Sequence, residues 1–451
     1  MTVSAKNIAV IGAGWAGCAA AVELARAGRQ VTLFEAGRYL GGRARRVEIN
    51  GSTLDNGQHI LLGAYRQSLQ LMRTVGIDPS AATLRLPLQM CYPADSGGMT
   101  FAAPRLPAPL HLLLALCRAR GLKRDDKLAL ARFSSAARWM GWQLNDDCSV
   151  STLLERFNQT ERLIQLMWRP LCIAALNTPP EQASAQVFLA VLRDSLGARR
   201  SASDMLLPRV NLSGLFPERA AAFIEQRGGS VRHGCHVRQL REYPNRHDRR
   251  WKLAGNGFSE EFDAVVIATP PDMAANLLSG LIAPALTSVL RGFSYEPITT
   301  CYLQYAADTR LERPFFALVD RPGSTSNSAA WGQFVFDRGQ LDPAQAGLLA
   351  VVISTSSAAI EAGRDMLGQA VAAQLAEVFR QPQLAHPDWI KVISEKRATF
   401  ACTPGLIRPA NRVPELDGVM LAGDYTVSDY PATLEAAVRS GMLAAQELLG
   451  S

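Results

Sequence analysis

The sequence has few of the residues that build disulfide frameworks, metal sites or membrane spans. Its eight cysteines include no CxxC pair and no closely spaced even-numbered set, which favours reduced thiols and a cytoplasmic protein. The mixed string His233-Gly234-Cys235-His236 would place neighbouring side chains on opposite faces of an extended segment, so we expect no metal site. The longest apolar run after the amino-terminal segment, residues 110–117, is far shorter than the roughly 18 residues that a membrane span needs.

Charged and aromatic residues are also scarce, at 19% and 7% of the 451 residues, while hydrophobic residues make up 48%. Such a composition can bury a large core and is neither fibrous nor disordered. At roughly 150 residues per domain, the length predicts about three structural units. The formal net charge of +7 would suit a phosphate ligand, a nucleic acid or an anionic membrane, but its value alone selects none of them.

The amino-terminal segment predicts a strand, a helix and a second strand. Residues 8–11 form a short apolar run, residues 16–27 are rich in alanine, and residues 31–34 are apolar again. This order is typical of the opening of a doubly wound parallel α/β sheet. A secretory signal peptide is the alternative interpretation, but Glu23 and Arg26 continue the helix beyond the apolar stretch.

The turn between that strand and that helix carries a dinucleotide-binding motif. Its sequence is Gly12-Ala13-Gly14-Trp15-Ala16-Gly17, which fits GxGxxG. The first glycine permits a tight turn, the second lets a pyrophosphate approach the backbone, and the third lets the helix pack on the strand. Glu35 ends the second strand, where a carboxylate can accept both ribose hydroxyls and disfavours the 2′-phosphate of NADP. The alternative, glycines that serve only the helix–strand junction, leaves Glu35 unexplained.

A second glycine pair follows in Gly41-Gly42-Arg43, whose arginine could form bidentate hydrogen bonds to a phosphate. From this point the chain resembles the flavoprotein superfamily of amine oxidases, protoporphyrinogen oxidases and carotenoid desaturases, which continues from GxGxxG and an acid to GGR. The resemblance implies that the bound dinucleotide is FAD. Without that spacing, a turn with a solvated arginine would explain GGR as well.

The carboxyl-terminal segment resembles the second FAD signature of the same superfamily. A predicted strand leads to Gly423-Asp424, and Ala432-Thr433-Leu434 open the last predicted helix. In that superfamily the aspartate contacts the ribityl and phosphate part of FAD. The helix amino terminus points at the flavin ring, where its dipole would stabilise a reduced, anionic flavin.

The motifs and the resemblance together imply a set of residues that contact FAD. They are Gly12, Gly14, Trp15, Ala16, Gly17, Glu35, Ala36, Gly41, Gly42, Arg43, Gly57, Gln58, His59, Val237, Thr269, Gly423, Asp424, Ala432, Thr433 and Leu434. Val237 matches a strand position whose backbone meets the adenine, and Thr269 follows a strand that passes near the cofactor.

Three further strings resemble one branch of the superfamily, the hydroxysqualene dehydroxylases. They are Asp55-Asn56-Gly57-Gln58-His59-Ile60, Asn177-Thr178-Pro179 and Leu207-Pro208-Arg209. The resemblance runs along nearly the whole chain. It implies reductive conversion of hydroxysqualene to squalene on the bacterial hopanoid or carotenoid route, with a reductant of unknown identity. We expect no nucleic-acid partner.

Such a reaction needs an acid that releases the hydroxyl group as water, and we expect His59 or Asp429 to supply the proton. Few ionisable residues fall near the expected flavin, and an apolar cavity would raise the pKa of an aspartate and keep it protonated. Each residue has another interpretation: His59 could only hydrogen-bond near the cofactor, and Asp429 could cap the turn before Tyr430.

Two other functions stay open. A carotenoid desaturase or an amine oxidase of the same superfamily would act oxidatively. A prenyl-binding regulator with this fold, such as a GDP dissociation inhibitor, would have no redox role, although the intact GGR and Gly423-Asp424 strings argue against it.

The motifs divide the chain into a discontinuous Rossmann-like domain with two insertions. We expect three FAD-binding pieces, a helical substrate cap and a mixed α+β substrate region. The FAD-binding pieces are residues 1–85, 229–275 and 396–451, the cap is residues 86–228, and the mixed region is residues 276–395.

The apolar residues 110–117 are followed by Arg118, Arg120, Lys123 and Arg124. A helix with such a basic end could rest on an anionic membrane surface, which would make the protein peripheral on the inner face of the cytoplasmic membrane. A buried helix with a solvated basic tail is the other interpretation.

Overall fold

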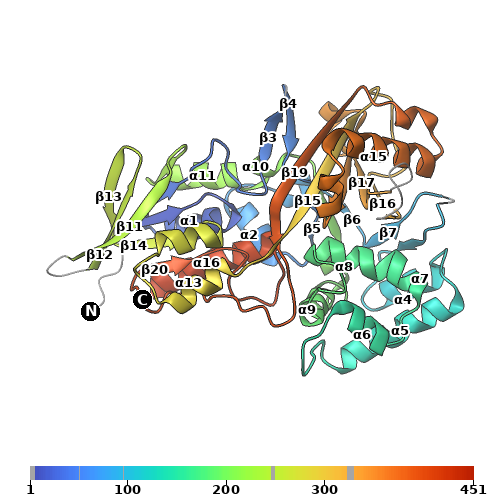
Figure 1. Ribbon diagram of the computed structural model, residues 1–451, viewed down its shortest axis with the longest axis horizontal. Helices are drawn as coiled ribbons and strands as arrows, with labels where there is room; N and C mark the ends of the chain where they lie inside the picture. The colour runs from blue at the N-terminus through green and yellow to red at the C-terminus, as the bar shows by residue number, and fades with distance from the viewer. Residues whose placement is uncertain (1–5, 50, 95, 245–248, 322–329, 451) are drawn as a thin grey trace.

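The computed structural model describes residues 6–49, 51–94, 96–244, 249–321 and 330–450. Figure 1 shows a parallel sheet with its helices at one end of the molecule, near both chain termini. An antiparallel sheet and a group of helices form the other end. The fold therefore separates a nucleotide-binding end from a substrate end.

The parallel sheet is built from segments far apart in the chain. Its order is β10 (Ser230–Arg232), β2 (Gln30–Phe34), β1 (Asn7–Ile11), β14 (Ala264–Ile267) and β20 (Val419–Leu421), and all neighbours pair in parallel. The central strands are apolar along their length because both faces are covered. The predicted doubly wound α/β sheet is confirmed.

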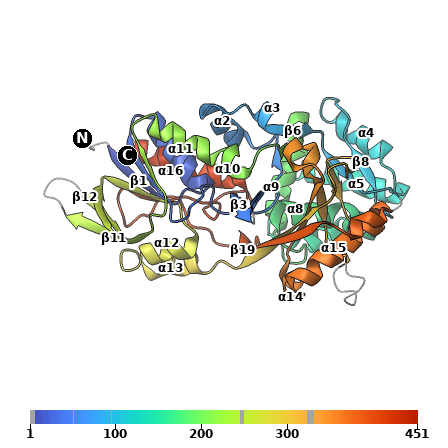
Figure 2. The same cartoon turned by 90° about the horizontal axis from the view of Figure 1, so that it is seen from above.

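Helices cover one face of this sheet and a small antiparallel sheet covers the other. The helices are α1 (Trp15–Arg26), α11 (Pro217–Glu225) and α16 (Leu434–Gly450), which lie together in Figure 2. The small sheet consists of β11 (Val237–Pro244), β12 (Arg249–Gly255) and β13 (Phe258–Phe262). Phe34 of β2 stacks on Phe258, with ring centroids 5.3 Å apart.

The position of α11 differs from the expected cap of residues 86–228. Its buried Ala220, Phe223 and Ile224 pack in the same core as α1, and the helix leads directly into β10. The cap helices themselves end with α9. The last part of the expected cap therefore belongs with the parallel sheet.

The substrate end contains a five-stranded antiparallel sheet. Its order is β16 (Phe315–Ala317), β17 (Phe334–Asp337), β18 (Leu348–Ser354), β15 (Tyr295–Gln304) and β19 (Trp389–Phe400). Helix α15 (Arg364–Phe379) packs on one face through Leu367, Val371 and Leu375. The other face contributes aromatic residues to the core shared with the helical cap.

The cap is a group of helices whose starts are marked by capping side chains. They are α4 (Leu110–Arg118), α5 (Arg124–Trp139), α6 (Val150–Arg156), α7 (Glu161–Leu163), a π-helical segment (Ile164–Trp168), α8 (Arg169–Leu176) and α9 (Ala185–Ser195). Ser149, Thr160 and Ser184 each accept a backbone hydrogen bond in the first turn of the helix that follows.

Short elements join these regions. The helices are α2 (Arg66–Thr74), α3 (Pro79–Ala82), α10 (Leu212–Leu215), α12 (Pro271–Leu277), α13 (Pro284–Arg291) and α14 (Ser357–Glu361). The strands are β3 (Arg46–Ile49), β4 (Ser52–Asp55), β5 (Leu61–Leu62), β6 (Thr83–Leu86), β7 (Gln89–Cys91), β8 (Thr100–Ala102) and β9 (Met205–Pro208). Among the described residues, every helix is too short or too polar to span a membrane.

Candidate functional site

The predicted site residues meet at the carboxyl ends of neighbouring parallel strands. Gly12 follows β1, Glu35 follows β2, Thr269 lies just beyond β14, and Gly423 lies just beyond β20. Ligands of open α/β sheets bind at this edge. The fold therefore gathers into one site motifs that are up to 411 positions apart along the chain, the separation of Gly12 and Gly423.

Two glycines of the GxGxxG turn are required by the chain itself. Gly12 has a φ of +99°, and a Cβ atom there would lie 2.6 Å from the Ala268 carbonyl oxygen. A Cβ atom on Gly17 would lie 1.8 Å from the Gly12 carbonyl oxygen. Side chains at these two positions would collide with backbone, so the turn and the helix–strand contact both need glycine.

Gly14 is different, because the chain leaves room beside it. Its φ of −71° suits any residue, and among the described residues a Cβ atom would meet only the Gly42 Cα atom, at 3.8 Å. Gly14 is also the N-cap of α1, and no side chain caps this helix start, which continues through Trp15 and Ala16. Open space beside an uncapped helix amino terminus fits the pyrophosphate of a dinucleotide.

Glu35 is held with its carboxylate at the end of β2. Its Oε2 atom accepts a hydrogen bond from the Ala13 amide at 2.9 Å, and its Oε1 atom accepts one from the Gly37 amide at 2.7 Å. The Cys235 amide donates to the Glu35 carbonyl oxygen at 2.8 Å, which places the start of β11 at Val237 close to the same edge. The carboxylate is positioned as an acceptor for ribose hydroxyls, and the exposed Ala36 follows it.

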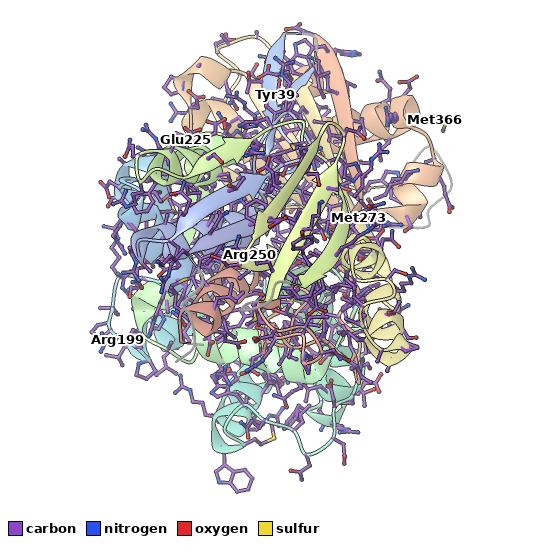
Figure 3. All side chains as sticks on the ribbon, turned by 90° about the vertical axis from the view of Figure 1, so that its left-hand side faces the viewer. Tyr39, Arg199, Glu225, Arg250, Met273 and Met366 are labelled. Atoms are coloured by element: carbon purple, nitrogen blue, oxygen red, sulfur yellow. The ribbon has the colours of Figure 1, made fainter. Side chains whose placement is uncertain are left out.

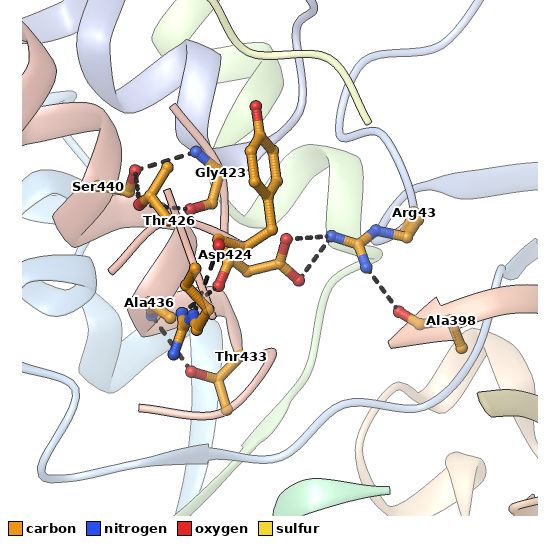
Figure 4. Close-up of polar contacts among 10 residues, drawn as sticks. Arg43, Ala398, Gly423, Asp424, Thr426, Thr433, Ala436 and Ser440 are labelled. Carbon is orange, nitrogen blue, oxygen red and sulfur yellow. Dashed lines mark hydrogen bonds and ion pairs between the residues drawn. The ribbon is translucent and has the colours of Figure 1, made fainter. Parts of the chain in front are cut away.

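Arg43 joins the first and last pieces of the nucleotide-binding region. Its Nη2 atom donates to both carboxylate oxygens of Asp424 at 2.6 Å, and its Nη1 atom donates to the Ala398 carbonyl oxygen at 2.8 Å (Figure 4). This geometry differs from the expectation that Arg43 offers its guanidinium to a phosphate, because its Nη2 atom already donates to both oxygens of Asp424. Gly41 and Gly42 both have positive φ and form the turn that brings Arg43 to this position.

Backbone contacts fix the loop that carries Asp424. Arg408 donates to the carbonyl oxygens of Asp424, Ser428 and Tyr430 at 2.5, 2.8 and 2.7 Å. The Gly423 amide donates to the Ser440 hydroxyl of α16 at 3.0 Å, as Figure 4 shows. The loop and the last helix therefore form one rigid unit.

The amino terminus of α16 lies beside this loop. Thr433 Oγ1 accepts a hydrogen bond from the Ala436 amide at 3.2 Å (Figure 4), and the helix begins at Leu434, after the half-buried Ala432. The partial positive charge of a helix amino terminus favours a nearby anion. This end of α16 is thus suited to a reduced, anionic flavin ring.

Two buried hydroxyl groups have no hydrogen-bond partner among the described residues. They are Thr300 Oγ1 on β15 and Tyr425 Oη, next to Asp424. Gly57 lies beside Thr300, because a Cβ atom on Gly57 would lie 3.9 Å from both Thr300 Oγ1 and His59 Cε1. Buried polar atoms are rarely left unpaired, and a flavin ring has polar edges that could satisfy them. The residues present therefore fit FAD.

His59 is half-buried and has a weak local contact, with its Nδ1 atom 3.4 Å from the Gly57 carbonyl oxygen. Burial lowers the pKa of His59 to about 4, and the charge of Arg43 acts in the same direction. The imidazole is therefore neutral near pH 7. A neutral imidazole can hydrogen-bond a substrate or the cofactor, but it is a poor reservoir for the proton that dehydroxylation needs.

Asp429 is not in an apolar cavity. Its side chain is 74% exposed, and its carboxylate lies 3.6 Å from the Arg193 guanidinium. The expectation that Asp429 lies in an apolar cavity is wrong, because the loop after Asp424 turns its side chain toward solvent. No general acid among the expected residues is supported by its surroundings.

Sequence reasoning missed a buried polar network behind the segment 57–59. Gln58 donates to the Tyr302 hydroxyl at 2.8 Å and accepts from the Arg338 guanidinium at 3.1 Å. The Tyr302 hydroxyl donates to the Asp55 carbonyl oxygen at 2.8 Å. These contacts orient the loop that carries His59, and no local pattern in the sequence indicates Tyr302 or Arg338.

The carboxyl group of Asp55 belongs to the same network. It is buried and accepts a hydrogen bond from the Leu212 amide at 2.8 Å. Burial raises the pKa of Asp55 to about 6, against the opposing effects of the Leu212 amide and the Arg338 charge. The folded protein thus keeps a proton on Asp55 to a higher pH than an exposed aspartate would.

Asn177 explains one of the strings that resemble the dehydroxylase branch. It ends α8 in the left-handed conformation, with a φ of 45°. Its side chain donates to the Glu296 carbonyl oxygen at 3.2 Å and to Thr399 Oγ1 at 2.9 Å, and it accepts from the Thr355 amide at 2.9 Å. This residue ties the cap to three segments of the substrate region.

Comparisons with known proteins agree with this geometry. The model of the family "Flavin containing amine oxidoreductase" matches residues 15–449. The hydroxysqualene dehydroxylase of Rhodopseudomonas palustris is 30% identical over 99% of both chains, and that of Sinorhizobium fredii is 28% identical over 98% of this chain and 97% of its own. The structure of cyclohexylamine oxidase from Brevibacterium oxydans superposes over 99% of both chains with a TM-score of 0.70 and 18% identity, a likeness that concerns the fold.

Proposed function

The chain belongs to the flavin containing amine oxidoreductase family, and from this premise we propose that it removes the hydroxyl group of hydroxysqualene reductively to give squalene. It is a flavin-dependent oxidoreductase with FAD as its cofactor. The observation that carries the substrate proposal is the 30% identity over 99% of both chains with a hydroxysqualene dehydroxylase.

The overall reaction replaces a carbon–oxygen bond with a carbon–hydrogen bond. The substrate takes up one hydride and one proton, and one molecule of water leaves. Bound FAD, in its reduced form, supplies the hydride. Because hydroxide is a poor leaving group, we propose that protonation of the hydroxyl group precedes hydride uptake and leaves an allylic cation for the hydride to attack.

The residues around the site have separate tasks in this proposal. Glu35 and the turn at Gly14 hold the adenosine and pyrophosphate. The Arg43–Asp424 pair fixes the loop before α16, whose amino terminus favours negative charge on the flavin. His59, as a neutral imidazole, and Thr300 border the space beside Gly57, where they can hydrogen-bond the reacting groups.

Identification of the product separates this function from its rivals. Purified holoprotein is incubated anaerobically with hydroxysqualene and a reductant, and the lipids are extracted and analysed. Squalene supports the proposal, whereas a more unsaturated polyene made by the oxidised protein would indicate a desaturase. A purified protein that is colourless and does not take up FAD would favour a prenyl-binding regulator.

We also infer that the protein is cytoplasmic and works as a peripheral protein at the inner face of the cytoplasmic membrane. Substrate and product are long hydrocarbons that partition into bilayers. A soluble enzyme reaches such a substrate most easily from the membrane surface. Reduction of the bound flavin by candidate electron donors is the measurement that identifies the physiological reductant.

A further inference from the structure

Two cap helices expose large apolar side chains to solvent. Leu110 and Leu113 of α4 are 54% and 53% exposed, and Leu128 and Trp139 of α5 are 60% and 90% exposed. Four of the eleven exposed large hydrophobic side chains of the described chain thus lie on these two helices. Such a concentration is unusual for a surface that faces only water.

The two helices lie near each other and run in opposite directions. Lys127, near the start of α5, donates to the carbonyl oxygen of Cys117 at the end of α4, at 2.8 Å. At the other end, burial lowers the pKa of His111 of α4, and the charges of Arg200 and of Arg138 on α5 act in the same direction, which places Arg138 near the start of α4. Leu110 is therefore at the same end as Trp139, and Cys117 at the same end as Leu128.

The exposed leucines and Trp139 are not needed for the core of the cap. On α4 the buried positions are His111 and Ala115, and on α5 the inward face carries Ala129, Phe133 and Ala137. The exposed apolar side chains point away from these positions. We call the four residues Leu110, Leu113, Leu128 and Trp139 the cap surface.

Basic residues surround the cap surface. Six exposed side chains on or between the two helices are cationic, and none of them forms an ion pair with another described residue. They are Arg118, Arg120, Lys123, Arg124, Arg132 and Arg138. The exposed Asp125 is the acidic neighbour on α5. The surface therefore combines apolar side chains with a strong local excess of positive charge.

We propose that the cap surface docks on an anionic lipid bilayer. Trp139 and the three leucines enter the headgroup region, and the arginine and lysine side chains contact lipid phosphates. A second copy of the chain fits this surface poorly, since a two-fold contact would bring two sets of six unpaired cations together. The proposal rests on the proposed function for its motive, a membrane-dissolved substrate, and adds the surface that meets the membrane.

Vesicle binding by matched variants tests the proposal. Holoprotein is sedimented with phosphatidylcholine vesicles that contain or lack anionic phosphatidylglycerol. The wild-type protein should bind the anionic vesicles and release at high salt. The double variant Arg120→Glu/Arg124→Glu should bind at least about 25-fold more weakly, because each of two basic charges contributes about fivefold at an anionic surface. The double variant Leu113→Ser/Trp139→Ser should bind at least about fivefold more weakly, because two apolar side chains no longer enter the headgroup region.

The control variants change equally exposed residues on α15. Met366 is 57% exposed and lies on the substrate region, at the edge of the view in Figure 3, and Arg364, two residues earlier, is also exposed. Met366→Ser and Arg364→Glu should bind vesicles like the wild type. All variants change exposed side chains, so FAD content and thermal stability should stay unchanged and show that the proteins are folded.

Three results would overturn the proposal: no preference of the wild type for anionic vesicles, equal binding by the cap variants, or equal losses in the α15 controls. A wild-type dimer that the Leu113→Ser/Trp139→Ser variant converts to a monomer, without vesicle binding by either, would identify a self-association surface instead. Turnover of detergent-dispersed hydroxysqualene tests the proposed function separately from the proposed docking surface. Activity without vesicle binding would contradict only the proposal of a docking surface. Vesicle binding without activity would contradict only the proposed function.

Discussion

At the scale of single residues, the glycines of the nucleotide turn differ in what they serve. Gly12 and Gly17 sit against backbone and are required by the fold, whereas Gly14 faces space that the chain leaves open. The spacing GxGxxG predicts all three positions because the motif is local. The distinction among them needs the structure, since it depends on the Ala268 carbonyl group from a distant strand.

This difference predicts that two alanine substitutions act on different properties, one on FAD affinity and the other on the stability of the apoprotein. Gly14→Ala should weaken FAD binding by at least about tenfold, because a methyl group blocks the approach of the pyrophosphate, while the apoprotein keeps its stability. Gly17→Ala should lower the free energy of unfolding of the apoprotein by about 2 kcal/mol or more, because its methyl group meets the Gly12 carbonyl group. Urea unfolding and FAD titration check both, and full FAD affinity in Gly14→Ala would contradict the assignment.

The buried carboxyl group of Asp55 predicts a pH-dependent stability. Its pKa is about 6 in the folded protein and about 3.9 in an unfolded chain, so the folded state holds the extra proton between these values and loses stability as the pH rises. Asp55→Asn should match the wild type near pH 4 and be more stable by about 2 kcal/mol at pH 7. Urea unfolding between pH 4 and pH 7 measures this difference, and Asp429→Asn, at an exposed site, is the control. A difference in unfolding free energy between Asp55→Asn and the wild type that does not change with pH would contradict the raised pKa of Asp55.

The neutral state of His59 predicts a modest role in proton transfer. With a pKa of about 4, the imidazole holds no transferable extra proton at pH 7. His59→Asn should keep the single-turnover rate within about tenfold of the wild type, whereas loss of a general acid would cost about 10²–10⁴-fold. Asp429→Asn should have no effect because the residue is solvated. Equal FAD content of the variants and the wild type must be confirmed first. A loss of about 10³-fold in the single-turnover rate of either variant would identify the substituted residue as the general acid.

At the scale of helices and strands, local patterns predict most elements and miss the contacts between them. The apolar runs and the alanine-rich segment predict β1, α1 and β2 because these signals act within one turn or one strand. Arg43 and Asp424 are both predicted as site residues, but their pairing is not, because 381 positions separate them. The network through Gln58, Tyr302 and Arg338 was missed for the same reason.

Asn177 connects the cap to the substrate region through hydrogen bonds, and the contribution of these bonds to stability can be measured. Asn177→Gly keeps a residue that tolerates the left-handed conformation but removes three side-chain hydrogen bonds, one of which the Thr355 amide donates. We expect it to lower the free energy of unfolding by about 2–3 kcal/mol. Asn158→Gly is the matched control, because Asn158 has a φ of 48° and is exposed. Equal, small losses in urea unfolding would show that Asn177 does not join the cap to the substrate region.

At the scale of the whole molecule, the sequence predicts a nucleotide-binding end with insertions, and the structure shows how the pieces return to one sheet. The expected cap extends too far, because α11 is amphipathic like the cap helices and only its packing on α1 reveals where it belongs. Helix α4 buries one face through His111 and Ala115, whereas Leu110 and Leu113 are exposed on the other. Which face of a helix meets solvent depends on its neighbours and is not fixed by its composition.

The central claim is that this flavoenzyme reduces its isoprenoid substrate, and a single turnover tests it most directly. Holoprotein is reduced anaerobically, freed of excess reductant and mixed with hydroxysqualene, while flavin absorbance and extracted squalene are followed together. We predict that squalene appears at the rate of flavin reoxidation and in equal molar amount, and that oxidised holoprotein makes none. Squalene formation without flavin reoxidation, or turnover of the substrate by the oxidised protein, would contradict it.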